Sequence, residues 1–141
     1  MVDKTKYNRQ VKGDHAELRV QSLLKRYGWH VLVPHSEANK YDVVAERDGE
    51  FVRIQVKSSV YDGTSVTFRC YSSNTDKSGN NRVDYTSNDI DGFAVYNAAT
   101  DAAFWVPIAE ANADKMAINM DCESAVNPAN EYDFADRFAV I

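Results

Sequence analysis

The amino-acid sequence predicts one mixed α/β domain, in which a long N-terminal helix and a shorter second helix flank a sheet of mainly antiparallel strands. Two observations predict this class. A stretch with helical periodicity comes first, and several short strands separated by turn residues follow it. With 141 residues and no internal repeat or linker, we expect a single domain over residues 1–141.

The long helix is predicted over residues 14–27, where apolar residues recur at spacings of three and four. Asp14 is a candidate N-cap, with Glu17 three residues later as in a capping box, and Gly28 is a typical helix end. The preceding residues 1–12 are rich in cations and form a predicted basic arm. This arm is either a solvated terminus or a segment that lies along a phosphate backbone.

Short alternating segments bounded by turn residues indicate the strands, which we expect at residues 29–34, 41–46, 50–58, 64–72, 92–97 and 103–106. Asp48-Gly49 is a hairpin turn. The polar residues 73–82 are predicted to be a flexible loop, and residues 108–115 a short helix. Three apolar residues near the C-terminus are expected to dock on the core: Phe134, Phe138 and Ile141.

The composition is that of an ordinary globular protein, with 44% hydrophobic and 26% charged residues. No apolar run approaches the roughly 20 residues that cross a bilayer, and the polar first dozen residues do not resemble a secretory signal. We therefore expect a cytoplasmic protein that makes no membrane contact.

The net charge of −5 is unevenly distributed. Residues 1–57 contain eleven Lys and Arg against eight Asp and Glu, whereas residues 58–141 contain five against thirteen. Overall acidity does not indicate a non-specific nucleic-acid binder. A basic region in the first half is still compatible with DNA binding, because salt screens charges beyond about 8–10 Å.

The segment from Tyr41 to Lys57 is the most informative part of the chain. In its second strand three apolar residues alternate with three polar ones, so Arg53, Gln55 and Lys57 share one face. Asp42 stands at the start of the first strand. This alternation is also found in ordinary surface hairpins, but an aspartate beside an amide and a lysine suits metal-assisted cleavage of phosphate esters.

Mg²⁺ prefers oxygen ligands and usually takes one or two carboxylates together with substrate oxygens and water. Asp42 can supply a carboxylate, Gln55 an amide oxygen, and Glu17 could reach in from the helix. An ammonium group at Lys57 can orient the attacking water or neutralise the charge that develops on the phosphate. The candidate catalytic residues are therefore Glu17, Asp42, Gln55 and Lys57.

These residues resemble the PD-(D/E)XK nuclease superfamily. The resemblance covers about residues 11–59, and it consists of Glu17 after Lys12-Gly13, then Tyr41-Asp42, then Gln55-Val56-Lys57 followed by two serines. Within the superfamily the chain is most similar to the group I intron-associated homing endonucleases, which have glutamine where most relatives have an acid. A weaker likeness continues through residues 85–96 and 104–107.

The resemblance implies a restriction-endonuclease-like fold and Mg²⁺-dependent cleavage of double-stranded DNA, with Mn²⁺ expected to substitute. It makes Asp42 the central metal ligand and Lys57 the catalytic lysine. Gln55 takes the second acidic position, and Glu17 is the acid on the helix that assists metal binding. The expected DNA contacts are Lys4, Lys6, Arg9, Lys12, Lys77 and Arg82.

Three functions stay open. The first is a homing-type endonuclease, which a virus or an intron could encode. The second is a Holliday-junction resolvase or another structure-selective nuclease that cuts branched DNA, against which Gln55 counts because resolvases usually carry an acid there. The third is an eroded nuclease that serves as a DNA-binding or assembly domain. A small nuclease with one site per chain needs a partner to cut both strands, so we expect a homodimer or homotetramer.

Overall fold

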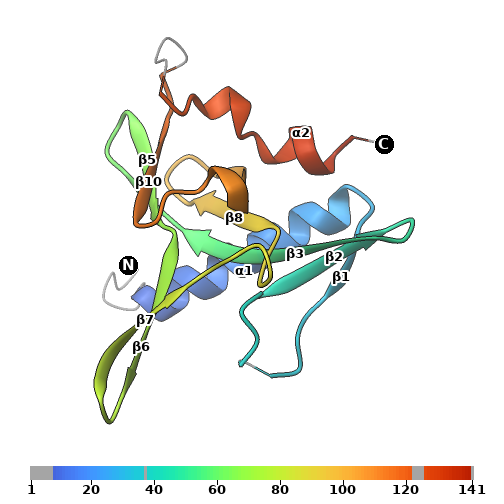
Figure 1. Cartoon of the computed structure of the whole chain (residues 1–141). Coiled ribbons are helices and arrows are strands. Elements are labelled where there is room, and N and C mark those ends of the chain that lie inside the picture. Colours follow the sequence, from blue (N-terminus) through green and yellow to red (C-terminus); the bar gives the residue numbers. More distant parts are fainter. Residues whose placement is uncertain (1–7, 37, 122–125, 141) are drawn as a thin grey trace, which may run out of the picture.

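A computed structural model describes residues 8–36, 38–121 and 126–140. Figure 1 shows the course of the chain. The elements are, in order, α1 (Arg9–Arg26), β1 (His30–Leu32), β2 (Val43–Arg47), β3 (Glu50–Ser58), β4 (Val60–Tyr61), β5 (Ser65–Arg69), β6 (Tyr71–Asp76), β7 (Gly79–Asp84), β8 (Gly92–Asn97), β9 (Ala102–Pro107), η2 (Ile108–Glu110), β10 (Lys115–Asn119), η3 (Ala129–Glu131) and α2 (Phe134–Phe138).

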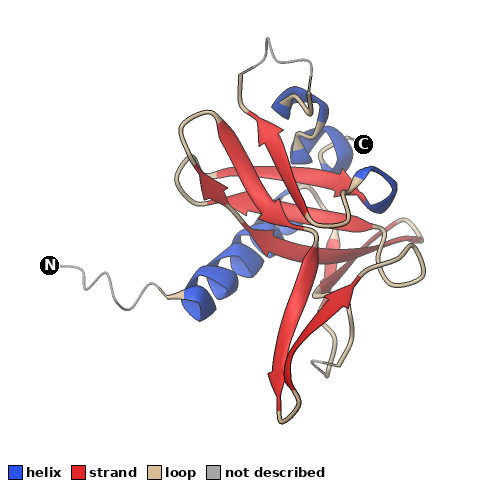
Figure 2. Cartoon of the chain, turned by 60° about the vertical axis from the view of Figure 1, so that its left-hand side comes forward, coloured by secondary structure: helices blue, strands red, loops and turns tan. Residues whose placement is uncertain are grey.

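The central sheet has five strands in the order β1-β2-β3-β8-β9. Its neighbours pair antiparallel except β3 and β8, which are parallel. A smaller sheet has the order β10-β5-β4, and β6 pairs with β7 in a hairpin that extends away from the body of the molecule (Figures 1 and 2). The mixed, mainly antiparallel sheet that the sequence predicts is confirmed.

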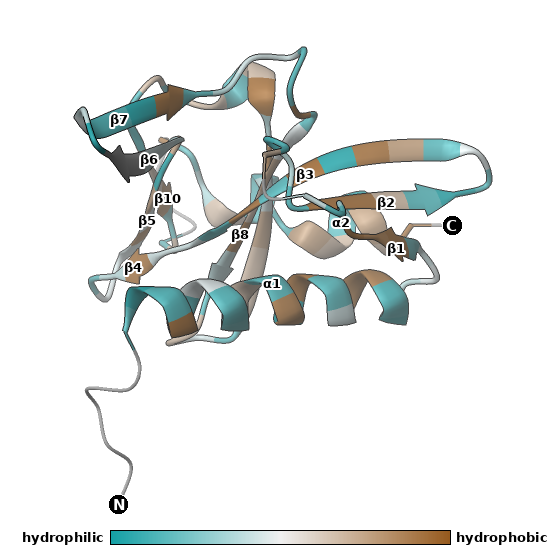
Figure 3. Cartoon of the chain, turned by 90° about the horizontal axis from the view of Figure 1, so that it is seen from below, coloured by the Kyte–Doolittle hydropathy of each residue, from teal (hydrophilic) through white to brown (hydrophobic). Residues whose placement is uncertain are grey.

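The two faces of the central sheet are covered by different elements. On one face, α1 packs against the apolar side chains of β3, and Figure 3 shows this helix running along the central strands. The residues that meet there are Ala16, Val20 and Leu24 of α1 and Val52, Ile54 and Val56 of β3. On the other face, β5 and β10 cover β8 and β9. Since alternate residues of β3 face opposite ways, Gln55 and Lys57 point to this second face.

Helix α1 begins earlier than predicted. The Asn8 side chain caps it by accepting a hydrogen bond from the Val11 N–H at 3.1 Å. Asp14 is therefore not the N-cap; it lies inside the helix, where the Gln10 amide donates to its carboxylate. Residues 9–12 of the expected arm are helical, and residues 1–7 lie outside the described part of the chain. Gly28, at φ 87°, follows the end of the helix as predicted.

Two predicted elements were wrong. Residues 73–82, expected as a loop, belong to the β6–β7 hairpin, in which Tyr71 pairs with Asp84 and Asp76 with Gly79. Residues 108–115, expected as a helix, form only the single 3-10 turn η2 before β10 begins at Lys115. The β6–β7 hairpin forms around a short turn despite the polar composition of its strands, whereas β10 forms by pairing with the distant strand β5.

The C-terminal residues dock on the core as predicted. Phe134 and Phe138 are buried and stack at 4.4 Å between ring centroids. Trp29 donates from its indole N–H to the Phe138 carbonyl at 2.8 Å, which ties the end of the chain to the start of β1. Ile141 lies outside the described residues. None of the described helices is long and apolar enough to cross a membrane.

Candidate active site

The β2–β3 hairpin brings Asp42 next to the part of β3 that carries Gln55. Its turn residues, Asp48 and Gly49, both have positive φ (53° and 84°), as a two-residue turn of type I′ requires. The turn fixes a register in which Val43, the first residue of β2, faces Ile54. Asp42 lies in the bend just before β2, and the side chains of Asp42 and Gln55 are both half-buried.

Backbone groups of β3 hold Asp42 in place. Its N–H donates to the Ile54 carbonyl at 2.8 Å, and its carboxylate Oδ2 accepts from the Val56 N–H at 2.9 Å. The other carboxylate oxygen accepts no hydrogen bond from a described residue. Asp42 is thus oriented through one oxygen, and the second is available to a ligand.

Lys57 reaches from β3 to the start of β6. Its ammonium donates to the Tyr71 carbonyl at 2.7 Å and to the Ser72 Oγ at 3.1 Å. The same nitrogen lies 5.6 Å from the ring centroid of Tyr85. Tyr85 in turn hydrogen-bonds through its hydroxyl to Ser72. The ammonium of Lys57 is therefore held by groups of the protein and does not extend into solvent.

The charges of Asp42 and Lys57 act on each other. Burial raises the pKa of the Asp42 carboxyl, while the Val56 N–H and the Lys57 ammonium oppose that rise. Burial lowers the pKa of Lys57 to about 8, although the Asp42 carboxylate opposes the change. Each group stabilises the charged form of the other, so the two lie in one site. Pairs of buried groups with shifted pKa values are typical of functional sites.

A divalent ion fits this donor set. The described residues contain no cluster of three or more His, Cys, Asp or Glu side chains, so the protein would supply few ligands. Asp42 has an unoccupied carboxylate oxygen, and the Gln55 amide across from it makes no hydrogen bond with any described residue. A site with one carboxylate and one neutral oxygen suits Mg²⁺, which keeps several waters and binds substrate phosphates directly.

Glu17 lies on α1, next to Ala16, whose side chain packs on the sheet, and it is half-buried. The apolar side of that helix packs on the face of β3 opposite to the one that carries Gln55 and Lys57. A role for Glu17 beside Asp42, Gln55 and Lys57 therefore stays a prediction from the sequence.

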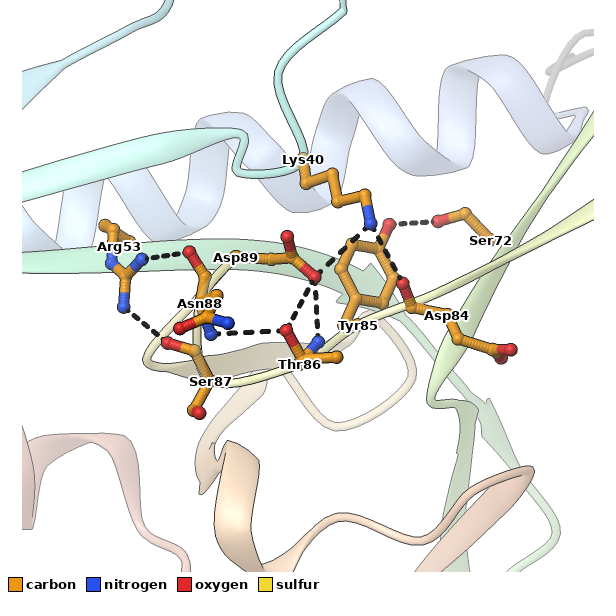
Figure 4. Close-up of polar contacts among 9 residues, drawn as sticks. All are labelled: Lys40, Arg53, Ser72, Asp84, Tyr85, Thr86, Ser87, Asn88 and Asp89. Carbon is orange, nitrogen blue, oxygen red and sulfur yellow. Dashed lines mark hydrogen bonds and ion pairs between the residues drawn. The ribbon is translucent and has the colours of Figure 1, made fainter.

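Arg53 has a structural partner that the sequence did not reveal. Its guanidinium forms an ion pair with Asp91 at 3.0 Å. It also donates to the carbonyls of Ser87 at 2.9 Å and Asn88 at 2.7 Å, as Figure 4 shows. Arg53 therefore holds the segment between β7 and β8 against β3. The alternation of β3 predicted only the face on which this arginine lies.

The cations expected to contact DNA are in different situations. Arg9 is exposed in the first turn of α1, Lys12 is half-buried there, and Lys77 is exposed in the turn of the β6–β7 hairpin. Arg82 forms ion pairs with Asp84 at 2.7 Å and Asp114 at 2.6 Å. These carboxylates raise the pKa of Arg82 above its ordinary value and occupy its guanidinium. Lys4 and Lys6 lie outside the described residues.

Comparisons with known proteins identify the fold and the family of the chain. The chain is similar to the structure of the bacterial homing endonuclease I-Ssp6803I, with 21% sequence identity over 92% of this chain and 91% of that one, and a TM-score of 0.77. This likeness shows the restriction-endonuclease-like fold. No curated protein matches the sequence. Residues 7–139 match the PD-(D/E)XK endonuclease family. Because this match covers nearly the whole sequence, the chain belongs to the PD-(D/E)XK endonuclease family.

Proposed function

We propose that this protein is a divalent-metal-dependent endonuclease that hydrolyses phosphodiester bonds of double-stranded DNA, with Mg²⁺ as its ion and Mn²⁺ able to substitute. The observation that carries the proposal is the shared site of Asp42, Gln55 and Lys57. Membership of a nuclease family supports the reaction class. The paired pKa shifts of Asp42 and Lys57 support these residues as its centre.

Asp42 and Gln55 would hold the metal ion through the free carboxylate oxygen and the amide oxygen. Glu17 joins the proposal through the family resemblance alone, as the acid on the helix that assists metal binding. When bound, the ion would polarise a phosphoryl oxygen and make a bound water more acidic. Asp42 is oriented for this task by the Val56 N–H.

Lys57 would act on the substrate as a cation. Its ammonium can orient the attacking water or neutralise the charge that gathers on the phosphate in the transition state. Such a contact is stronger in a partly buried site than in water, because the local dielectric constant is lower.

The DNA would cross the site along cations that have no ion pair among the described residues, and we propose Arg9, Lys12 and Lys77 for these contacts. Lys4 and Lys6 lie outside the described residues and join the proposal from the sequence alone. Arg82 would have to exchange Asp84 and Asp114 for a phosphate. Because the chain carries a net charge of −5, binding would depend on this local set of cations.

One observation favours a second candidate, a DNA-binding or assembly domain that has lost catalysis. Gln55 puts a neutral amide where most family members have an acid, and two of the three N–H groups of Lys57 are already hydrogen-bonded within the protein. A purely structural Lys57 would make the same contacts. The remaining function, a nuclease that cuts branched DNA, can be tested in the same assay.

Cleavage of a pool of linear duplexes and of four-way junctions, each with and without Mg²⁺, separates the three functions. We expect the linear duplex to be cut only with Mg²⁺, and Lys57→Ala to abolish cutting without weakening DNA binding. Preferential cutting of junctions would establish a structure-selective nuclease. Binding without any cutting, in Mg²⁺ or Mn²⁺, would contradict the proposal and favour the DNA-binding domain.

A further inference from the structure

The ammonium group of Lys57 has a fixed orientation. It carries three N–H donors. Two of them point to the Tyr71 carbonyl and the Ser72 hydroxyl, at 2.7 and 3.1 Å. No third acceptor for this group occurs among the described residues. Since the three N–H bonds are arranged tetrahedrally, the two protein acceptors determine the direction of the third donor.

Tyr85 influences the position of Lys57 in two ways, directly through its ring and indirectly through Ser72. Its ring lies beside the ammonium, 5.6 Å from nitrogen to centroid, at a distance where the negative ring face attracts a cation. Its hydroxyl shares a hydrogen bond with the Ser72 Oγ, the same atom that accepts from Lys57. Tyr85 thus sets the position of the Ser72 hydroxyl, and both residues set the position of the lysine.

Tyr85 is itself held on both sides. Its ring meets Phe93 of β8 edge-on, at 5.5 Å between centroids and 89° between planes. Figure 4 shows Lys40 spanning the segment around it, with hydrogen bonds to the Asp84 carbonyl at 3.4 Å and to the Asp89 carboxylate at 3.3 Å. Arg53 binds the carbonyls of Ser87 and Asn88 further along the same segment. The backbone that follows Tyr85 is therefore fixed by hydrogen bonds.

We propose that Ser72 and Tyr85 are positioning residues for Lys57, which direct its remaining N–H toward the attacking water or a phosphate oxygen. The inference rests on the proposed function, because it assigns these residues to the same cleavage reaction. Neither residue needs to touch the substrate, so both act through the lysine. Catalysis depends steeply on such placement, and a shift of about 1 Å can lower a rate on the order of 100-fold.

The test measures DNA cleavage in the presence of Mg²⁺ by variants that each lack one hydroxyl group. Tyr85→Phe keeps the ring and removes the hydrogen bond to Ser72, and Ser72→Val removes the acceptor of Lys57. We expect each variant to lower kcat about 10- to 100-fold while KM for DNA stays within about twofold. Ser72→Thr has nearly the shape of Ser72→Val and restores the hydroxyl, so we expect it to recover most of the rate.

Two matched controls remove the same groups elsewhere. Tyr61→Phe loses a hydrogen bond to the Gly63 carbonyl, and Ser65→Ala loses one to Asn119. Both should cleave at the wild-type rate.

A double variant tests whether Ser72 and Tyr85 act as one unit. If they do, it should be no slower than the slower single variant, because removing either residue already releases the lysine.

The outcomes distinguish this inference from the proposed function. Wild-type protein that cuts DNA, together with Tyr85→Phe and Ser72→Val at full kcat, would overturn the inference alone. An increase in KM without a loss of kcat would also overturn it, because it would place the two residues in DNA binding. Equal rates for Ser72→Thr and Ser72→Val would show that the hydroxyl has no role. Wild-type protein that does not cut would end both proposals.

Discussion

At the scale of single residues, the main feature of the site is the buried charge of Lys57. Burial lowers its pKa from the ordinary 10.5 to about 8, even though the Asp42 carboxylate opposes the shift. The folded protein therefore holds this proton less tightly than the unfolded chain does. Between pH 8 and 10.5 the unfolded state binds more protons than the folded state, so the free energy of unfolding rises with pH in that window.

The direction of this pH dependence gives a prediction for the metal-free protein. The free energy of unfolding of the wild type, minus that of Lys57→Met, should increase as the pH is raised from 8 to about 10.5. Urea unfolding at several pH values measures it. Lys115→Met, which changes an exposed lysine of β10, is the control and should give a smaller pH dependence of this difference. A Lys57→Met difference that does not change with pH would show that the folded state leaves the lysine fully solvated.

A second prediction concerns Gln55. Gln55→Glu adds a second carboxylate to the proposed metal site, and an additional negative oxygen ligand should bind Mg²⁺ more tightly. The Mg²⁺ concentration that gives half-maximal cleavage should fall severalfold, and Gln55→Ala should raise it. A dependence on Mg²⁺ that neither substitution alters would remove Gln55 from the metal site.

The residues of the site differ in how far the sequence could predict them. Asp42, Gln55 and Lys57 lie on one local hairpin, where the turn and the alternation of β3 determine which side chains share a face. Ser72 and Tyr85 reach the site only through the β6–β7 pairing and the segment that follows it. Ser72 ends a predicted strand and Tyr85 follows the predicted loop at residues 73–82, and no local pattern at either position indicated this contact.

At the scale of elements, β8 and β9 leave no room for a side chain at Gly92. A Cβ atom at Gly92 would lie 2.6 Å from the Val106 carbonyl oxygen and 2.7 Å from the Trp105 ring. Gly92 also pairs with Ile54, the residue immediately before Gln55. The parallel contact that places the end of β3 therefore depends on a residue without a side chain.

We predict that Gly92→Ala lowers the free energy of unfolding by about 1–3 kcal/mol, as is typical of overpacked positions. Gly13→Ala is a matched control, because Gly13 is in α1 with nothing within 4 Å of its Cβ position. It should stabilise the protein by up to about 1 kcal/mol. Denaturant unfolding of both variants measures the difference. Equal stabilities would contradict the prediction, because they would show that β8 and β9 can move apart to accommodate a methyl group at no cost.

Elements with a clear local signal were predicted well. The β2–β3 hairpin follows from turn residues and alternation, and β8 and β9 follow from two short apolar segments separated by a polar turn. The β6–β7 hairpin is also local, but its strands are polar and do not indicate a buried face. The alternation in β10, with Met116 and Ile118 buried, is visible only once β5 is known as its partner. The start of α1 was missed because Asn8, a good N-cap, lies in a polar stretch that resembles a solvated arm.

At the scale of the whole molecule, each chain contributes one candidate site, whereas cutting a duplex requires action on two strands. We therefore predict a homodimer or homotetramer that produces double-strand breaks. Sedimentation measures the oligomeric state, and a supercoiled plasmid distinguishes linear from nicked product. A monomer that yields only nicked circles would contradict this prediction without contradicting the proposed chemistry.

The location of a bound metal ion tests the central claim most directly. Crystals of the protein grown with duplex DNA and Mn²⁺ would reveal the ion by its anomalous scattering. We predict a peak within about 2.0–2.5 Å of the free Asp42 oxygen and close to the Gln55 amide, and its loss in Asp42→Asn. A peak elsewhere, or none beside Asp42 in crystals that contain DNA, would contradict the assignment of the site.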